Sequence, residues 1–188
     1  MTSDPQWANV QHVKCLRDGT PRAERSRCVR YEGYGPGGSA LLVDCCTDDP
    51  EGTRTRLRRS FREHGGYLGA EGSVGYLFDH VGVLRYRSGP SPQWLTQAAL
   101  SAGAEAVIGA ERSIEVLTDP RDFDGIRAEL RRGGFAPLTA EVTERAAVTA
   151  PLGGEAARHM VRLIEALTEL DDVCDVYTNA ELIGAPPG

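Results

Sequence analysis

Apolar positions recur with a period of two in several segments of the chain, and this alternation predicts short β-strands there. The first clear case is Val29 to Tyr34, and a second strand is expected at 39–47, around the apolar run Ala40–Val43. The segment between them, Gly35–Gly38, predicts a turn, because glycine tolerates positive φ and proline fixes its own φ. Further strands are expected over these segments: 72–78, 81–85, 114–117, 140–144 and 173–177.

Elsewhere apolar positions recur every three to four residues, which predicts helices between the strands. The first helix is expected to start at Asp48–Glu51, where a proline and acidic residues suit a helix N-terminus, and to run to about His64. Three more are expected from about 91 to 102, from 118 to 133, and after Gly153–Gly154. The first 28 residues show no sustained period and are expected to form a tail or a short helix.

Strands and single helices therefore alternate, which predicts an α+β fold of two small α/β sandwiches with ferredoxin-like βαβ elements. The last helix and strand can complete the first sandwich, so the second sandwich is expected to be inserted into the first. The expected divisions are a short N-terminal stub (1–28), a first domain (29–80 with 152–182), an inserted second domain (81–151) and a tail (183–188).

Composition narrows the class of protein. The 188 residues are 40% hydrophobic and 26% charged, which is ordinary for a folded soluble protein and excludes disordered, collagen-like and disulfide-dense chains. No apolar run approaches the roughly 20 residues of a membrane helix, so no membrane partner is expected. The N-terminus lacks the features of a signal peptide, and the five cysteines are an odd number without CxxC spacing. Reduced thiols and a cytoplasmic location are expected.

Charge is unevenly distributed along the chain. The net charge is −6, but residues 1–64 hold 11 basic and 9 acidic residues, whereas residues 65–188 hold 10 basic and 18 acidic ones. A surface that binds phosphates is therefore expected in the first third of the chain.

A dense arginine cluster lies in the first predicted helix. Arg54, Arg58 and Arg62 recur every four residues and so share one helix face, which Arg56 and Arg59 broaden. This pattern is typical of a salt-sensitive contact with a phosphate backbone that is independent of base sequence. The alternative is a solvated face whose arginines pair with acidic residues from elsewhere in the chain.

Other motifs predict structure rather than chemistry. The Gly35–Gly38 loop has neither Walker nor GxGxxG spacing, and the histidines show no metal-ligand spacing, so no cofactor, no metal and no catalytic group are expected. Cys45 and Cys46 are adjacent in a strand, which directs their thiols to opposite faces and favours packing. Asp171–Asp172 is interpreted as part of a turn.

The segment Arg30–Gly38, RYEGYGPGG, resembles the signature of the YebC/PmpR family, whose members are bacterial regulators related to the mitochondrial translational activator of cytochrome c oxidase subunit I. Further similar segments are 47–49, 61–66, 68–78, 102–105, 118–123, 140–143 and 170–173, with Val176–Tyr177 and Asn179. The resemblance implies a helical N-terminal domain followed by two α/β domains, the third inserted into the second. It also implies a non-enzymatic regulator, either a DNA-binding transcriptional regulator or a ribosome-associated factor that helps translation of proline-rich stretches.

The chain departs from the family pattern near its N-terminus. Trp7–Lys14 resembles the opening segment of the family, but Gln6 and Gln11 stand where lysine is usual, and only residues 15–28 precede the signature. The family has most of a basic helical domain there, so the resemblance implies a truncated member whose residues 1–28 are a remnant of that domain.

The expected partner is nucleic acid, either DNA or ribosomal RNA, with binding weakened by the truncation. The candidate nucleic-acid-binding residues are Arg54, Arg56, Arg58, Arg59, Arg62 and Lys14. The alternative is a protein-interaction module, or a pathway-specific accessory protein, repurposed after loss of the nucleic-acid-binding domain, which binds a protein partner or a second copy of itself.

Overall fold

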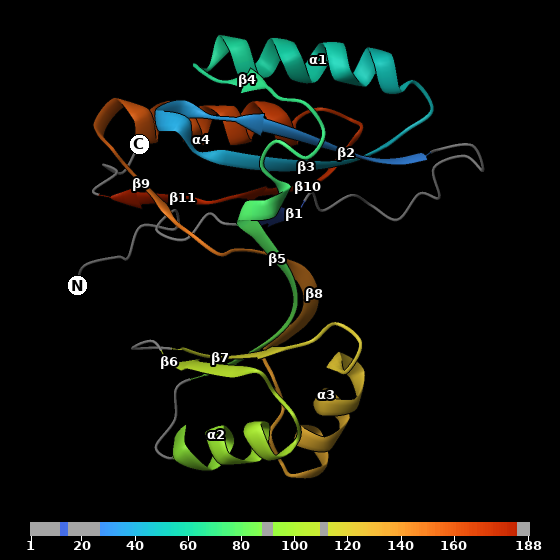
Figure 1. Cartoon of the computed structure of the whole chain (residues 1–188), viewed down its shortest axis with the longest axis vertical. Coiled ribbons are helices and arrows are strands. Elements are labelled where there is room, and N and C mark those ends of the chain that lie inside the picture. The colour runs from blue at the N-terminus through green and yellow to red at the C-terminus, as the bar shows by residue number, and fades with distance from the viewer. Residues whose placement is uncertain (1–11, 15–26, 88–91, 110–112, 184–188) are drawn as a thin grey trace. The chain divides into compact units, whose positions relative to one another are not determined.

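The computed structural model describes residues 12–14, 27–87, 92–109 and 113–183 (Figure 1). It confirms the α+β class, because the described residues form four α-helices and largely antiparallel sheets. They divide into two compact units: residues 80–144 form one, and the described residues before and after this stretch form the other. Most of the expected stub, and residues 184–188 of the expected tail, lie outside the described residues.

The first unit is built on a five-stranded antiparallel sheet in the order β1-β10-β3-β2-β4. Its strands are β1 (His12–Lys14), β2 (Arg27–Tyr34), β3 (Ala40–Thr47), β4 (Tyr67–Leu68) and β10 (Val173–Thr178). Helices α1 (Pro50–Glu63) and α4 (Gly154–Thr168) contact each other and pack on this sheet (Figure 1). A separate parallel pair, β9 (Ala150–Gly153) and β11 (Ala180–Ile183), adjoins α4.

The two faces of this sheet carry different residues. Alternate residues of β3 face the helices, and with Tyr31 of β2 and Val173 and Val176 of β10 they are fully or nearly buried against α1 and α4. The other face holds a smaller cluster at one end: Ala40, Leu42, Val74, Phe78, Ala146 and Tyr177. Both α-helices of this unit, α1 and α4, pack on the first face.

The predicted turn and first helix are confirmed. Gly37 and Gly38 have φ values of 67° and 77°, which a residue with a Cβ rarely adopts, and they allow β2 to return directly as β3. The Asp49 side chain accepts a hydrogen bond from the Gly52 N–H at 3.0 Å and caps α1, while Pro50 occupies its first turn.

The second unit contains a four-stranded sheet in the order β6-β7-β5-β8. Its strands are β5 (Phe78–Arg87), β6 (Ala106–Gly109), β7 (Ser113–Thr118) and β8 (Thr139–Ala146), and its helices are α2 (Pro92–Ser101) and α3 (Phe123–Arg132). It has its own core, centred on Leu84, Val116 and Leu130.

The strand predicted at 72–78 is wrong. Only Phe78 lies in a strand, and a 3₁₀ turn at Gly75–Leu77 precedes it. The buried Glu32 carboxylate accepts hydrogen bonds from the backbone N–H groups of Gly72, Val74 and Gly75 at 2.7–2.8 Å, so these donors are not available for a strand ladder.

The N-terminal expectation is also corrected where the structure describes it, because His12–Lys14 form a strand that pairs with β10 rather than a tail or helix. The chain returns to the first unit at Arg145, earlier than the expected boundary at 152. Ala146 packs in the cluster with Phe78 and Tyr177, the Ala147 N–H donates to the Leu77 carbonyl, and β9 pairs with β11.

Candidate nucleic-acid interface

Three of the five arginines of α1 form a continuous exposed row. Thr53, Leu57 and Phe61 are buried and hold one face of the helix on the sheet. Arg54, Arg58 and Arg62 are exposed on α1, and none of the three forms an ion pair with another residue that the structure describes. We call these three residues the arginine row.

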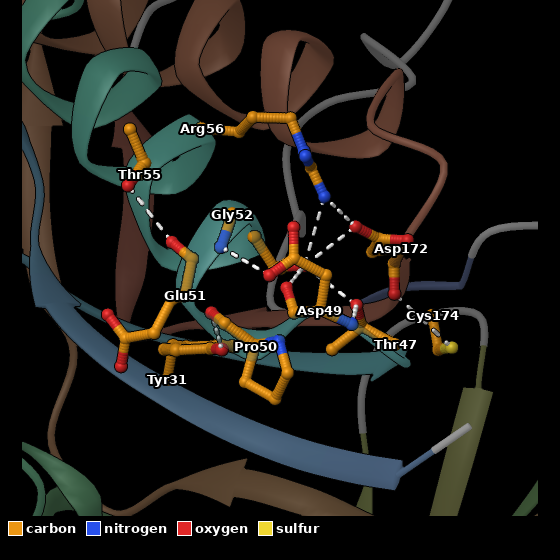
Figure 2. A network of polar contacts seen from close by, with 11 residues as sticks. Tyr31, Thr47, Asp49, Pro50, Glu51, Gly52, Thr55, Arg56, Asp172 and Cys174 are labelled. Atoms are coloured by element: carbon orange, nitrogen blue, oxygen red, sulfur yellow. Dashed lines mark hydrogen bonds and ion pairs between the residues drawn. The ribbon is translucent and has the colours of Figure 1, made fainter. Parts of the chain in front are cut away.

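Arg56 differs from the arginine row, because its guanidinium is paired inside the molecule. It forms an ion pair with the Asp172 carboxylate, which is only 6% exposed, and it donates a hydrogen bond to Thr53 Oγ1 at 3.1 Å (Figure 2). The Thr53 hydroxyl lies 2.7 Å from Asp172 Oδ2. Arg56 therefore ties the first turns of α1 to the turn before β10, and its charge compensates a buried carboxylate.

The surroundings of Arg56 are strongly acidic. An open pocket at this end of α1 is lined by Asp48, Asp49, Arg56, Glu169, Leu170, Asp171 and Asp172. A polyanion is repelled by this lining, so Arg56 is poorly placed to contact phosphate.

Arg59 is also paired, with Glu63 one turn later on α1 at 2.7 Å between Nε and Oε1. The hydrogen bond from Arg59, helped by nearby positive charges, lowers the pKa of Glu63. The expected set of five arginines thus divides into three without a described ionic partner and two with one.

The charge on α1 is not shared by the helix beside it. Residues 50–63 hold five arginines and two glutamates, a net charge of +3. The exposed residues of α4 mix both signs, since Arg158 and Arg162 lie near Glu155 and Glu165, and Glu169 follows the helix directly. Sequence analysis did not single out Arg158 and Arg162, although their spacing of four residues is the same signal as in α1.

Lys14 is not on α1. It lies in β1, an edge strand, where its register partner is Asp175 of β10, and its side chain lies outside the described part of the structure.

Asp172 is the residue that sequence analysis misjudged. Its backbone is in a turn, as predicted, but its side chain is also buried against α1, where it contacts Thr53 and Arg56. This contact of Asp172 with α1 could not be predicted from the sequence, because Thr53 and Arg56 precede Asp172 by more than 110 positions.

Metal and membrane chemistry find no support in the described segments. No group of three or more His, Cys, Asp or Glu side chains in them is arranged to hold a metal ion. Of the helices described, none is both long and apolar enough to span a bilayer.

The structure therefore defines an α+β protein in which one unit is built from two separate stretches of the chain and one helix, α1, carries the arginine row. Residues 26–180 match the family model described as "TACO1/YebC second and third domain". The chain belongs to the TACO1/YebC family, which confirms the resemblance noted in its sequence.

Similar proteins carry a common name. A "probable transcriptional regulatory protein" of Halorhodospira halophila is 44% identical over 165 residues, which cover 87% of this chain and 67% of that protein. A protein of the same name from Verminephrobacter eiseniae is 47% identical over 155 residues, covering 82% of this chain and 65% of the relative. The chain thus spans about two thirds of the length of these relatives.

A solved structure supports the fold. The crystal structure of a conserved hypothetical protein, Aq1575 from Aquifex aeolicus, matches with a TM-score of 0.73 and 32% identity. The match covers 90% of this chain and 71% of that one.

Proposed function

We propose that this chain is a non-enzymatic regulator of gene expression in the cytoplasm, and that it contacts nucleic-acid phosphates through the arginine row. The observation that carries the proposal is the exposure of Arg54, Arg58 and Arg62 on one rigid helix, without an ion pair to another described residue. The names of the matched relatives support a regulatory role.

The geometry of the arginine row suits a phosphate backbone. Residues four apart on a helix are separated by about 6 Å along its axis, so the row extends over about 12 Å. Guanidinium groups bind phosphate oxygens in a bidentate manner and stay charged at every physiological pH. Phosphate contacts position a protein but do not specify bases, and they are available on DNA and on ribosomal RNA alike.

The proposal is tested by measuring binding across a salt series. Fluorescence anisotropy with a labelled DNA duplex and with a ribosomal RNA hairpin compares the wild type with Arg54→Gln/Arg58→Gln/Arg62→Gln. Loss of three phosphate contacts is expected to reduce the slope of log K against log salt on the duplex by about 2 to 3 and to weaken binding most at low salt.

The matched control removes the same charge from the second unit. Arg121→Gln/Arg131→Gln/Arg132→Gln neutralises three exposed arginines at and around α3 and is expected to leave both affinities and slopes unchanged. Equal losses in the two triple variants would mean that net charge, and not the arginine row, drives binding. The RNA and DNA affinities of the wild type then distinguish a translational from a transcriptional role.

The second candidate is a surface for a protein partner, and α2 favours it. Trp94 and Leu100 on this helix are 69% and 52% exposed, and Leu100 also lines an open pocket with Gln93, Thr96, Gln97 and Ser101. A wild type that binds neither probe at low salt would favour this second candidate over the first.

A further inference from the structure

Three cysteine thiols that are far apart in the sequence meet on the sheet of the first unit. Cys28 of β2 and Cys46 of β3 are directly opposite each other in the antiparallel register, and their Sγ atoms are 3.4 Å apart. The third thiol is that of Cys174, from β10, which raises the pKa of Cys46 and donates a weak hydrogen bond to the Asp172 carbonyl oxygen at 3.8 Å. Cys45 faces the other way and is 1% exposed in the core beneath the helices.

The backbone already holds Cys28 and Cys46 at a separation that suits a disulfide. Directly opposed residues of an antiparallel pair have Cα atoms about 4.5 to 5.5 Å apart, within the range of about 4.4 to 6.8 Å found for disulfides. Closing the sulfur–sulfur distance to about 2.05 Å requires only rotation of the two side chains. No strand has to move.

The accessibility of the thiols gives them different roles. Cys28 is exposed, so a reagent in solution reaches it first. The neighbouring Cys174 thiol, followed by burial and the Cys28 thiol, raises the pKa of Cys46 to about 12. Burial raises the pKa of Cys45 to about 12 as well, and that thiol is enclosed in the core. Cys28 is therefore the attacking thiol and Cys46 the resolving one.

We propose that Cys28 and Cys46 are a thiol modification site that forms a reversible intramolecular disulfide by exchange with a small-molecule disulfide. The Cys28 thiolate attacks one sulfur of the small disulfide, which forms a mixed disulfide and releases one small thiolate, and that thiolate takes up the proton from Cys28. The Cys46 sulfur then attacks the Cys28 sulfur, and a second small thiol leaves with the proton from Cys46. In total two protein thiols are oxidised to one disulfide, and one small disulfide is reduced to two thiols.

The pairing is tested on the full chain by equilibration with glutathione and its disulfide, acid quenching, alkylation and tryptic digestion without reductant. Cleavage after arginine releases Cys28–Arg30 and Tyr31–Arg54 as separate peptides. The expected product is these two peptides joined, with fragmentation assigning the link to Cys46 rather than Cys45. Reduction with excess glutathione is expected to remove it.

Serine variants separate this pairing from the alternatives. Cys46→Ser is expected to lower the amount of linked peptide at least tenfold, whereas Cys174→Ser and Cys15→Ser leave it unchanged. Circular dichroism shows whether each variant is folded, and Cys28→Ala provides a second variant that removes the link from the other side. Mixing labelled and unlabelled protein shows whether the link joins one chain or two.

Several results would overturn the inference. They are the absence of linked peptide in the wild type under oxidising glutathione, a link from Cys28 to Cys45, Cys174 or Cys15, and a product that carries one labelled and one unlabelled peptide.

Discussion

Arg56 and Arg58 lie two residues apart on α1 but have different surroundings. The Arg56 guanidinium is paired with the nearly buried Asp172 carboxylate, whereas Arg58 is exposed and forms no ion pair within the described segments. Arg56→Gln is expected to destabilise the fold by about 1–3 kcal/mol, because it leaves a buried carboxylate without its cation. Arg58→Gln, the matched control, is expected to stay within about 0.5 kcal/mol of the wild type. Urea unfolding measures both, and equal effects would contradict this division.

The same division shows what sequence alone can and cannot predict about the site. The spacing of Arg54, Arg58 and Arg62 depends only on helical geometry and was readable directly. The ion pair between Arg56 and Asp172 cannot be predicted in this way, because the two residues are 116 positions apart and only the folded chain brings them together. The nearness of Cys28 and Cys46 had a readable signal, since both lie nine residues from Gly37 at the centre of the predicted hairpin turn.

Among the structural elements, the segment 72–75 depends on one carboxylate. Burial alone would raise the pKa of Glu32, but three backbone N–H donors and the nearby Arg30 outweigh it, so the pKa of Glu32 is lower than its usual value of 4.5. Since the folded-state pKa is the lower one, Glu32 contributes stability that is fully present above pH 4.5 and is lost as the pH falls through the folded-state value.

Glu32→Gln is therefore expected to cost about 1–3 kcal/mol at pH 7, because a neutral amide satisfies the three donors less well. The difference from the wild type should shrink as the pH drops below 4.5. Urea unfolding of both proteins between pH 3 and 7 measures it. A difference that does not change with pH would show that the charge of Glu32 is not what holds this segment.

The elements that sequence predicted best are those with several agreeing local signals. The helix α1 combines a cap, an early proline, a buried stripe and a terminal glycine pair, and β2 and β3 flank a glycine-rich turn. The strands that it missed, β1, β4, β6, β9 and β11, have two to four residues each and exist because of their pairing partners. The segment 72–78 alternates like a strand, but Glu32, forty or more positions earlier, determines its conformation.

Across the whole molecule, each unit has a core of its own, and this predicts separate responses to core damage. Leu130→Ala removes a side chain that is 1% exposed in the second unit and is expected to cost that unit about 2–5 kcal/mol. Hydrogen exchange monitored by mass spectrometry should show faster exchange in residues 80–144 while α1, β3 and α4 keep their protection. Leu163→Ala in α4 is the reciprocal control, and loss of protection throughout the chain in either variant would contradict the expectation.

The position of β10 in its sheet has a consequence for synthesis. β10 lies between β1 and β3, yet it is made only after the whole stretch 80–144, which is continuous and has a complete core to itself. While the chain is being made, β3 therefore has an open edge long after the β2–β3 hairpin has emerged. During this interval the open edge of β3 can pair with strands of other nascent chains. This risk ends only when β10 has been synthesised and pairs with β3.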